Sequence, residues 1–103
     1  MHPAIAEKRE AVAALCRRFG VTRLELFGSA ARGDDFDAEK SDADFLVVFG
    51  EEPDLSALDQ VFGFAEALET VLGRPVDLVD ASAIENPYLR AAIDRSKELF
   101  YAA

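Results

Sequence analysis

The sequence predicts an α/β domain in which helices pack on a short mixed β-sheet. Segments with apolar residues at helical spacing alternate along the chain with short strand-like segments, the order expected of such a fold. Half of the 103 residues are hydrophobic and eight of them are Phe, which is enough to build a core. Because this length is typical of one domain, we expect residues 1–103 to form a single domain.

The chain is expected to begin with a helix over residues 3–19. Ile5, Val12 and Cys16 recur at helical spacing, and Gly20 follows as a stop signal. Cys16 is the single cysteine, and its apolar position favours a buried hydrophobic role over catalysis. This cysteine usage indicates a reducing cytoplasm. No apolar run approaches the ~20 residues that a membrane helix needs.

A strand is expected over residues 21–27, with Glu25 on its polar face, and a turn follows at Gly28 and Ser29. Glycine lets the backbone approach a bulky anion, and a short helix that begins after it would offer N–H groups to a phosphate. Ser29 could serve that phosphate or simply cap the helix. Arg32 could reach a phosphate, or it could form an ion pair with a neighbouring carboxylate.

Asp42 and Asp44 open a second strand over residues 42–49, after a markedly acidic connection that is typical of a surface loop. Residues two apart on a strand point to the same face, so the two carboxylates would project side by side. Two such charges repel each other, and a divalent cation would relieve that repulsion, Mg²⁺ being well suited to oxygen ligands. The apolar run over residues 45–48 predicts a central strand covered on both faces.

A broad apolar face predicts a helix over residues 55–72 that packs on the sheet. Leu58, Phe62 and Phe64 are expected among its core residues. Gly73 ends this helix, since glycine readily adopts the left-handed conformation that follows a helix.

A third strand is expected over residues 75–79, where Asp77 interrupts apolar residues. A carboxylate inside an apolar strand is costly unless it is paired. Asp77 therefore either joins Asp42 and Asp44 as a third acid or forms a salt bridge with a basic residue such as Arg74. Further along the chain we expect Asp80 to cap a helix, a helix over residues 88–97, and a short edge strand over residues 99–101.

The net charge of the chain is −9, with 20 acidic and 11 basic side chains. Binding of nucleic acid depends on cations that neutralise phosphates, so this charge argues against direct nucleic-acid binding. An acidic surface suits a basic protein partner, or it simply maintains solubility.

Gly28-Ser29, then Asp42-Ala43-Asp44, then Asp77 on a later strand resemble the motif of the nucleotidyltransferase superfamily that includes DNA polymerase beta. The similarity is greatest to its minimal nucleotidyltransferase branch and runs along nearly the whole chain. The connection between Ser29 and Asp42 is a couple of residues longer than is usual in that family. The resemblance implies the nucleotidyltransferase fold.

The resemblance also implies a metal-dependent nucleotidyltransferase. An NTP, expected to be ATP, would place its phosphates against Gly28 and Ser29, with Arg32 nearby. Asp42, Asp44 and Asp77 would be the catalytic acids that hold two Mg²⁺ ions.

Proteins of the minimal branch are commonly antitoxins that transfer AMP to a tyrosine of a HEPN-type ribonuclease toxin, so the resemblance implies such a partner. Two other functions stay open: a non-catalytic binding module that neutralises its partner by occlusion, and a nucleotidyltransferase that acts on a small molecule. Occlusion alone would require none of the three acids.

Overall fold

The computed structural model describes residues 1–28, 31 and 42–103 of the chain. Two of the residues singled out above, Ser29 and Arg32, lie outside the described residues. The helices and strands, in chain order, are α1 (Pro3–Ala6), α2 (Arg9–Phe19), β1 (Val21–Phe27), β2 (Ala43–Phe49), α4 (Ala57–Leu72), β3 (Val76–Asp80), the 3₁₀ helix η1 (Ala81–Ala83), α5 (Pro87–Ser96) and β4 (Glu98–Ala102).

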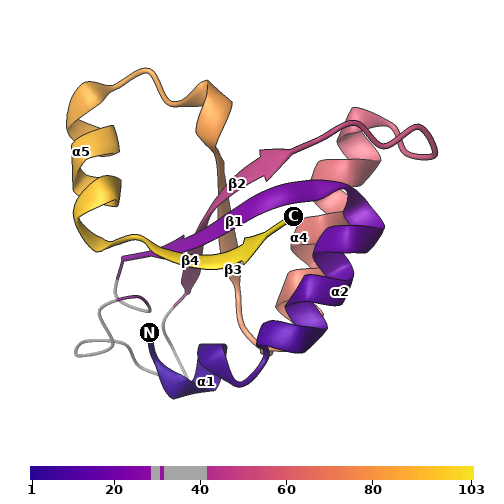
Figure 1. Ribbon diagram of the computed structural model, residues 1–103, viewed down its shortest axis with the longest axis horizontal. Helices are drawn as coiled ribbons and strands as arrows, with labels where there is room; N and C mark the ends of the chain where they lie inside the picture. The colour runs from indigo at the N-terminus through magenta and orange to yellow at the C-terminus, as the bar shows by residue number, and fades with distance from the viewer. Residues whose placement is uncertain (29–30, 32–41) are drawn as a thin grey trace.

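The strands form one four-stranded sheet in the order β3-β2-β1-β4 (Figure 1). β1 pairs antiparallel with both β2 and β4, whereas β2 and β3 run parallel to each other. The prediction of a short mixed sheet packed with helices is therefore confirmed, as is the edge strand at the end of the chain.

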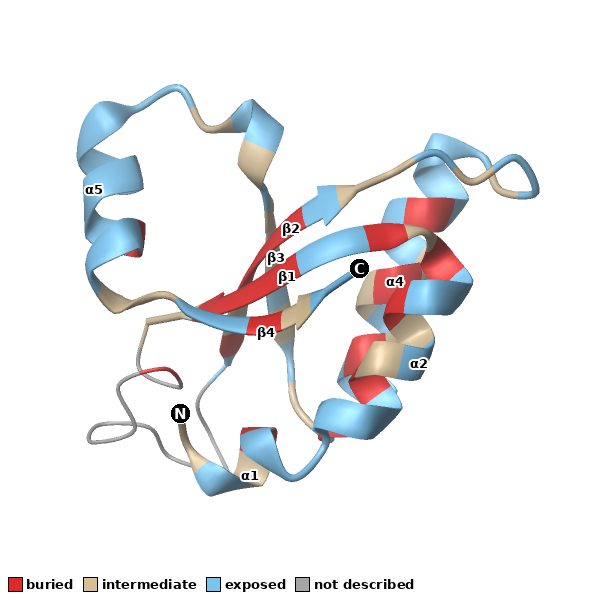
Figure 2. Ribbon diagram, viewed as in Figure 1, coloured by how far each residue is buried: buried red, intermediate tan, exposed pale blue. Residues whose placement is uncertain are grey.

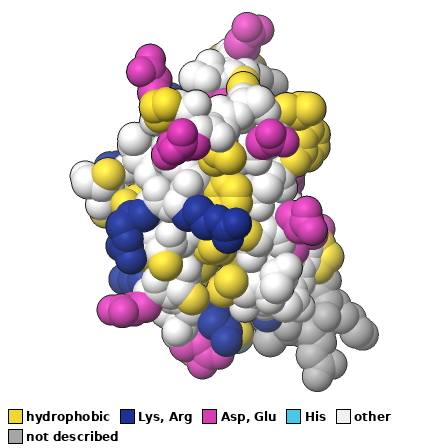
Figure 3. Space-filling model, turned by 90° about the vertical axis from the view of Figure 1, so that its right-hand side faces the viewer, with side chains coloured by type: hydrophobic (Ala, Val, Ile, Leu, Met, Phe, Trp, Pro, Cys, Tyr) yellow, Lys and Arg dark blue, Asp and Glu magenta, His cyan; other side chains and the backbone are white. Residues whose placement is uncertain are grey.

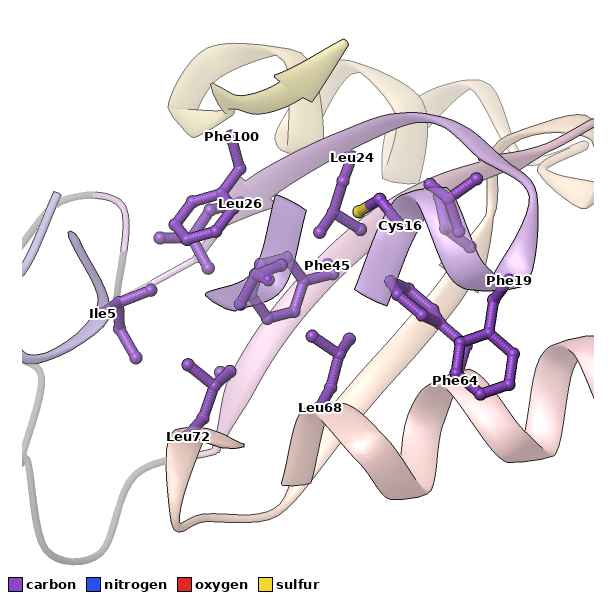
Figure 4. Close-up of a cluster of buried hydrophobic side chains, with 14 of the residues drawn as sticks. Ile5, Cys16, Phe19, Leu24, Leu26, Phe45, Phe64, Leu68, Leu72 and Phe100 are labelled. Carbon is purple, nitrogen blue, oxygen red and sulfur yellow. The ribbon is translucent and has the colours of Figure 1, made fainter. Parts of the chain in front are cut away.

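The main hydrophobic core lies between the sheet and the helices α2 and α4, which cover one face (Figure 4). The helices α1, α2 and α4 and the strands β1, β2 and β4 all contribute buried side chains. Examples are Ile5, Cys16, Leu26, Phe45, Phe64, Leu68 and Phe100. The rings of Phe45 and Phe100 meet edge to face with their centroids 5.7 Å apart. The burial of Cys16 confirms its expected structural role.

The opposite face of the sheet is covered less completely. α5 lies on this side, away from α2 and α4, and most of its surface is exposed (Figures 1 and 2). Within α5 the buried residue is Ile93, and on β2 Leu46 is buried outside the main core. Val48, further along β2, is exposed. The prediction that this strand is covered on both faces is therefore wrong at Val48, because the cover on the second face is partial.

The N-terminal helix is divided, contrary to the single helix expected over residues 3–19. α1 ends at Ala6, and Lys8 has non-helical dihedral angles, so α2 begins afresh at Arg9. The amide of Lys8 donates to the carbonyl of Ile5 at 3.0 Å, a tight turn that interrupts the helical pattern. Apolar spacing predicted a continuous helix, since this break involves neither Pro nor Gly.

The core face of α4 also differs from the predicted one. Leu58 and Phe62 were expected in the core, but they are 66% and 62% exposed. The buried row is instead the one that contains Gln60 and Phe64. The side-chain amide of Gln60 donates to the carbonyls of Phe19 (2.8 Å) and Gly50 (2.9 Å). Phe62 lies two residues from both Gln60 and Phe64, which is roughly 200° around the helix. Its side chain therefore points toward solvent.

A groove of about 680 Å³ runs between α2 and α4 on the outer side of this helical layer (Figure 3). Apolar residues that include Leu15 and Phe62 line it, together with Arg18 on α2 and Asp59 and Glu66 on α4. The groove therefore lies on the helix-covered side of the sheet. No helix in the described part of the chain is long and apolar enough to cross a membrane.

Candidate active site

Asp44 and Asp77 lie opposite each other on neighbouring parallel strands, since the register of β2 and β3 pairs these two residues. Their side chains share one face of the sheet. Ala43 and Phe45, on either side of Asp44, are completely buried in the main core, so the alternation of the strand directs Asp44 to the opposite face. The pairing brings the second and third predicted acids together.

The pKa of the Asp44 carboxyl is raised above its ordinary value, first by burial and then by the negative charges of Asp77 and Asp42. Asp42 precedes the first residue of β2 and is exposed, as is Asp77, whereas Asp44 is half-buried. The three carboxylates are therefore close enough to influence one another. Asp80, the next acid on β3, instead caps η1 by accepting from the Ser82 amide at 2.9 Å, as predicted.

Gly28 lies against Asp44, the half-buried acid of the three. It follows β1, whose last residue, Phe27, pairs with Asp44. Its φ of +74° is one that residues with side chains rarely adopt, and a Cβ atom at this position would lie 2.7 Å from Oδ2 of Asp44. The glycine of the predicted turn therefore lies beside Asp44, one of the predicted acids. Ala31, three residues further along the chain, is buried, and its N–H donates to the carbonyl of Gly28 at 3.2 Å.

Ser96, at the end of α5, also contacts the turn. Its Oγ atom accepts a hydrogen bond from the backbone N–H of Gly28 at 3.2 Å. The two residues are 68 positions apart in the sequence, so no local pattern around either of them indicates the contact.

Glu25 is a second feature that sequence patterning did not reveal. It was expected on a polar face, yet its side chain is only 7% exposed. Arg23 Nε lies 3.2 Å from one carboxylate oxygen, and Lys97 Nζ lies 3.6 Å from the other. Lys97 directly follows Ser96, so two adjacent residues attach the end of α5 to β1 and to the glycine that follows it.

The donor set of the acidic cluster suits a hard divalent cation. It consists of carboxylate oxygens, the ligands that Mg²⁺ prefers. A cation would offset both the burial of Asp44 and its repulsion by Asp77 and Asp42, which together raise the pKa of Asp44. Within residues 1–28, 31 and 42–103, however, no three His, Cys, Asp or Glu side chains already converge as a ligand set. Asp42 and Asp77 are exposed and can rotate toward Asp44. The chemistry of the residues therefore fits the ion.

Comparison with known proteins gives the same assignment as the sequence motif. The family model described as "Nucleotidyltransferase domain" matches residues 8–99. Protein adenylyltransferase MntA of Thermococcus cleftensis is 41% identical over 81 residues, which are 79% of this chain and 73% of that protein. A solved structure provisionally assigned as a minimal nucleotidyltransferase is 37% identical, with a TM-score of 0.74 over 95% of each chain.

A further solved structure shares the fold at 19% identity. It contains a tri-AMPylated HEPN toxin of Shewanella oneidensis in complex with an MNT antitoxin. The TM-score is 0.63, over 94% of this chain and 71% of the matched one. With a family match along most of its length, the chain described here belongs to the nucleotidyltransferase domain family, within the minimal nucleotidyltransferases, and is a nucleotidyltransferase.

Proposed function

We propose that this nucleotidyltransferase transfers AMP from ATP to a tyrosine hydroxyl of a HEPN-type toxin, and so acts as its antitoxin in the cytoplasm. The observation that carries the proposal is the pairing of Asp44 with Asp77 on adjacent strands beside Gly28. The name of the Thermococcus cleftensis relative and the AMPylated toxin in the Shewanella oneidensis complex support the choice of AMP and of the partner.

In this proposal the turn after β1 and the acidic cluster hold the triphosphate between them. The triphosphate would lie along the turn at Gly28 and Ser29, with the α-phosphate toward Asp44 and Arg32 as a further phosphate contact. Asp42, Asp44 and Asp77 would hold two Mg²⁺ ions. When bound, such ions neutralise charge on the phosphates and lower the pKa of a coordinated hydroxyl.

The tyrosine oxygen attacks the α-phosphorus of ATP. A new O–P bond forms, the bond between the α-phosphorus and the oxygen that bridges to the β-phosphate breaks, and pyrophosphate leaves with that electron pair. The hydroxyl proton passes to Asp77, the exposed acid of the pair, from which water can remove it. The main work of the protein is to position the two reactants and to balance charge.

A protein acceptor, rather than a small molecule, agrees with the surface on this side of the sheet. α5 exposes Tyr88 (85%) and Leu89 (46%) there, apolar area of the kind that protein partners cover. The net charge of −9 favours association with a basic protein, as an RNA-cleaving partner is expected to be.

The test is to co-express this chain with a HEPN-type toxin and to measure the intact mass of that toxin. The wild-type chain should add AMP. Asp77→Asn should lower the rate of transfer by roughly 100-fold or more while the two proteins still bind each other. Asp54→Asn is the matched control, because it removes the same charge from an exposed loop residue outside the cluster.

Protection of host cells separates the alternatives. If Asp77→Asn protects cells as well as the wild-type chain does, the protein neutralises its partner by occlusion, and the transfer proposal fails. If labelled ATP modifies a small molecule and never the partner, the acceptor class is wrong. A partner that stays unmodified in the presence of ATP and Mg²⁺ would also contradict the proposal.

A further inference from the structure

We infer that Ser96 is a positioning residue for nucleotide transfer, which holds the Gly28 turn in the conformation that receives the triphosphate. This inference rests on the proposed function of the Gly28 turn and adds a residue that lies outside the family motif. It is carried by the hydrogen bond between the Gly28 N–H and Ser96 Oγ, at 3.2 Å and partly shielded from solvent.

The register of β1 and β4 explains why these two residues meet. The antiparallel pairing sets Leu26 opposite Glu98. Two steps further in the same register, Gly28 falls opposite Ser96, just beyond the start of β4. A paired strand would offer a backbone carbonyl to the Gly28 N–H at this point. Residue 96 belongs to a helix instead, and the serine hydroxyl takes the place of that carbonyl.

The contact matters because the glycine itself does little to fix the backbone at this point. Gly28 adopts a φ of +74°, and glycine crosses between conformations more easily than any other residue. The position of the Gly28 backbone decides how much room is left beside Asp44, since a Cβ atom at Gly28 would lie 2.7 Å from Oδ2 of Asp44. Holding the N–H of Gly28 therefore holds the turn against the acidic cluster before a nucleotide arrives.

Ser96 is itself well anchored. The next residue, Lys97, makes ion pairs with the buried Glu25 of β1 at 3.6 Å and with Asp94 at 3.0 Å. Lys97 N–H also donates to the carbonyl of Ile93, the buried residue of α5. Within the described part of the chain the Ser96 hydroxyl has no acceptor for its own proton. That proton is available to donate to an oxygen of a bound phosphate.

The test compares Ser96→Ala, Ser96→Thr and Ser56→Ala. Ser96→Ala removes the acceptor and should lower kcat/KM for ATP by roughly 3- to 10-fold, mainly through a higher KM. Ser96→Thr keeps a hydroxyl and should restore the wild-type KM. Ser56→Ala is the matched control, because Ser56 Oγ accepts from a backbone N–H at 3.1 Å in the same way but caps α4 away from the site.

Amide exchange measured by NMR gives a readout that does not depend on activity. The Gly28 N–H should exchange faster with solvent in Ser96→Ala and at the wild-type rate in Ser96→Thr and Ser56→Ala. If Ser96→Ala does not fold, Ser96→Cys carries the same test, since sulfur is a weak acceptor.

Two failures are distinguishable. If the wild-type chain binds no ATP in calorimetry with Mg²⁺, the proposed function fails, whatever Ser96 does. If the wild-type chain binds and transfers AMP, the inference is overturned when Ser96→Ala keeps the wild-type KM. It is also overturned when Ser56→Ala raises KM as much, because the effect would then be one of general stability.

Discussion

Gly28 and Asp44 are packed so closely that the glycine has no room for a side chain. A Cβ atom at Gly28 would stand 2.7 Å from Oδ2 of Asp44, well inside van der Waals contact. Gly28 directly follows β1, and the last residue of that strand, Phe27, pairs with Asp44 on the adjacent antiparallel strand β2. The turn that is proposed to receive phosphate and the acid proposed to hold the metal therefore cannot move independently.

Gly28→Ala should damage nucleotide binding more than stability. The positive φ costs a residue with a side chain about 1–2 kcal/mol, and the contact with Asp44 displaces either the turn or the carboxylate. Gly73→Ala is the matched control: Gly73 also has a positive φ, +67°, but among the described residues no atom beyond its immediate chain neighbours lies within 4 Å of its Cβ position. Both variants should unfold at lower urea concentration, and only Gly28→Ala should lose ATP affinity in calorimetry. Equal ATP affinity in both variants would contradict the close coupling of turn and acid.

Asp44→Asn should stabilise the metal-free protein at neutral pH. The pKa of Asp44 is raised, so folding favours its protonated form. The stability that this gives is present below the unfolded pKa of about 3.9 and is lost as the pH rises through the raised value. In EDTA, the variant should therefore have the higher Tm near pH 7, and the difference should shrink toward about pH 3.

Asp54→Asn, which removes an exposed acid outside the cluster, is the matched control and should leave the Tm near pH 7 unchanged. Added Mg²⁺ should raise the Tm of the wild-type chain and have less effect on Asp44→Asn. A lower Tm for Asp44→Asn at neutral pH would mean that the ionised carboxylate stabilises the fold.

Cys16 should be unreactive in the folded protein. Burial raises the pKa of its thiol to about 12, an effect that the neighbouring Arg17 opposes only in part. Because the thiolate is the reactive form, a thiol reagent at pH 8 should label the unfolded chain and not the native one. Stability should also fall as the pH rises from about 8.5 toward that value, since the unfolded chain ionises first. Cys16→Ala should abolish both the labelling and this alkaline loss, and rapid labelling of the native wild-type chain would refute the assignment.

Gln60→Leu should destabilise the fold although it adds an apolar residue to a helix. The amide of Gln60 satisfies two carbonyls, those of Phe19 and Gly50, and the variant would leave both without this donor. The cost is expected to be about 1–3 kcal/mol in urea unfolding. Thr22→Val is the control, since the Thr22 hydroxyl donates to the Val48 carbonyl at an exposed position and its loss should cost under about 0.5 kcal/mol. Similar losses in both variants would show that burial does not set the cost.

The strands were the part of the structure that the sequence predicted best. Short apolar segments between Gly and Pro signals predicted all four strands, and alternation predicted the shared face of Asp42 and Asp44. That Asp77 would join them depended on which strands pair, which local patterning does not determine. The parallel pairing of β2 and β3 supplies that information.

The errors arose where tertiary contacts outweigh local periodicity. Phe62 is more hydrophobic than Gln60. Gln60 is nevertheless buried, because its side-chain amide donates hydrogen bonds to one carbonyl at the end of α2 and to another just after β2. Glu25 is buried because a lysine far along the chain reaches it. The hydrogen bond between Ser96 and Gly28 could not be predicted for the same reason, because the two residues are 68 positions apart in the sequence. In each case a polar partner supplied by a distant segment decided the outcome.

The pairing of β2 with β3 sets the separation between Asp44 and Asp77 by main-chain hydrogen bonds, and no flexible connection contributes to it. Substitutions elsewhere can therefore change which acceptor molecule approaches the two carboxylates without altering the distance between them. The exposed surface of α5 is the natural place for such change. Relatives that modify different hydroxyl groups would then diverge in this helix while retaining the same reactive geometry beneath it.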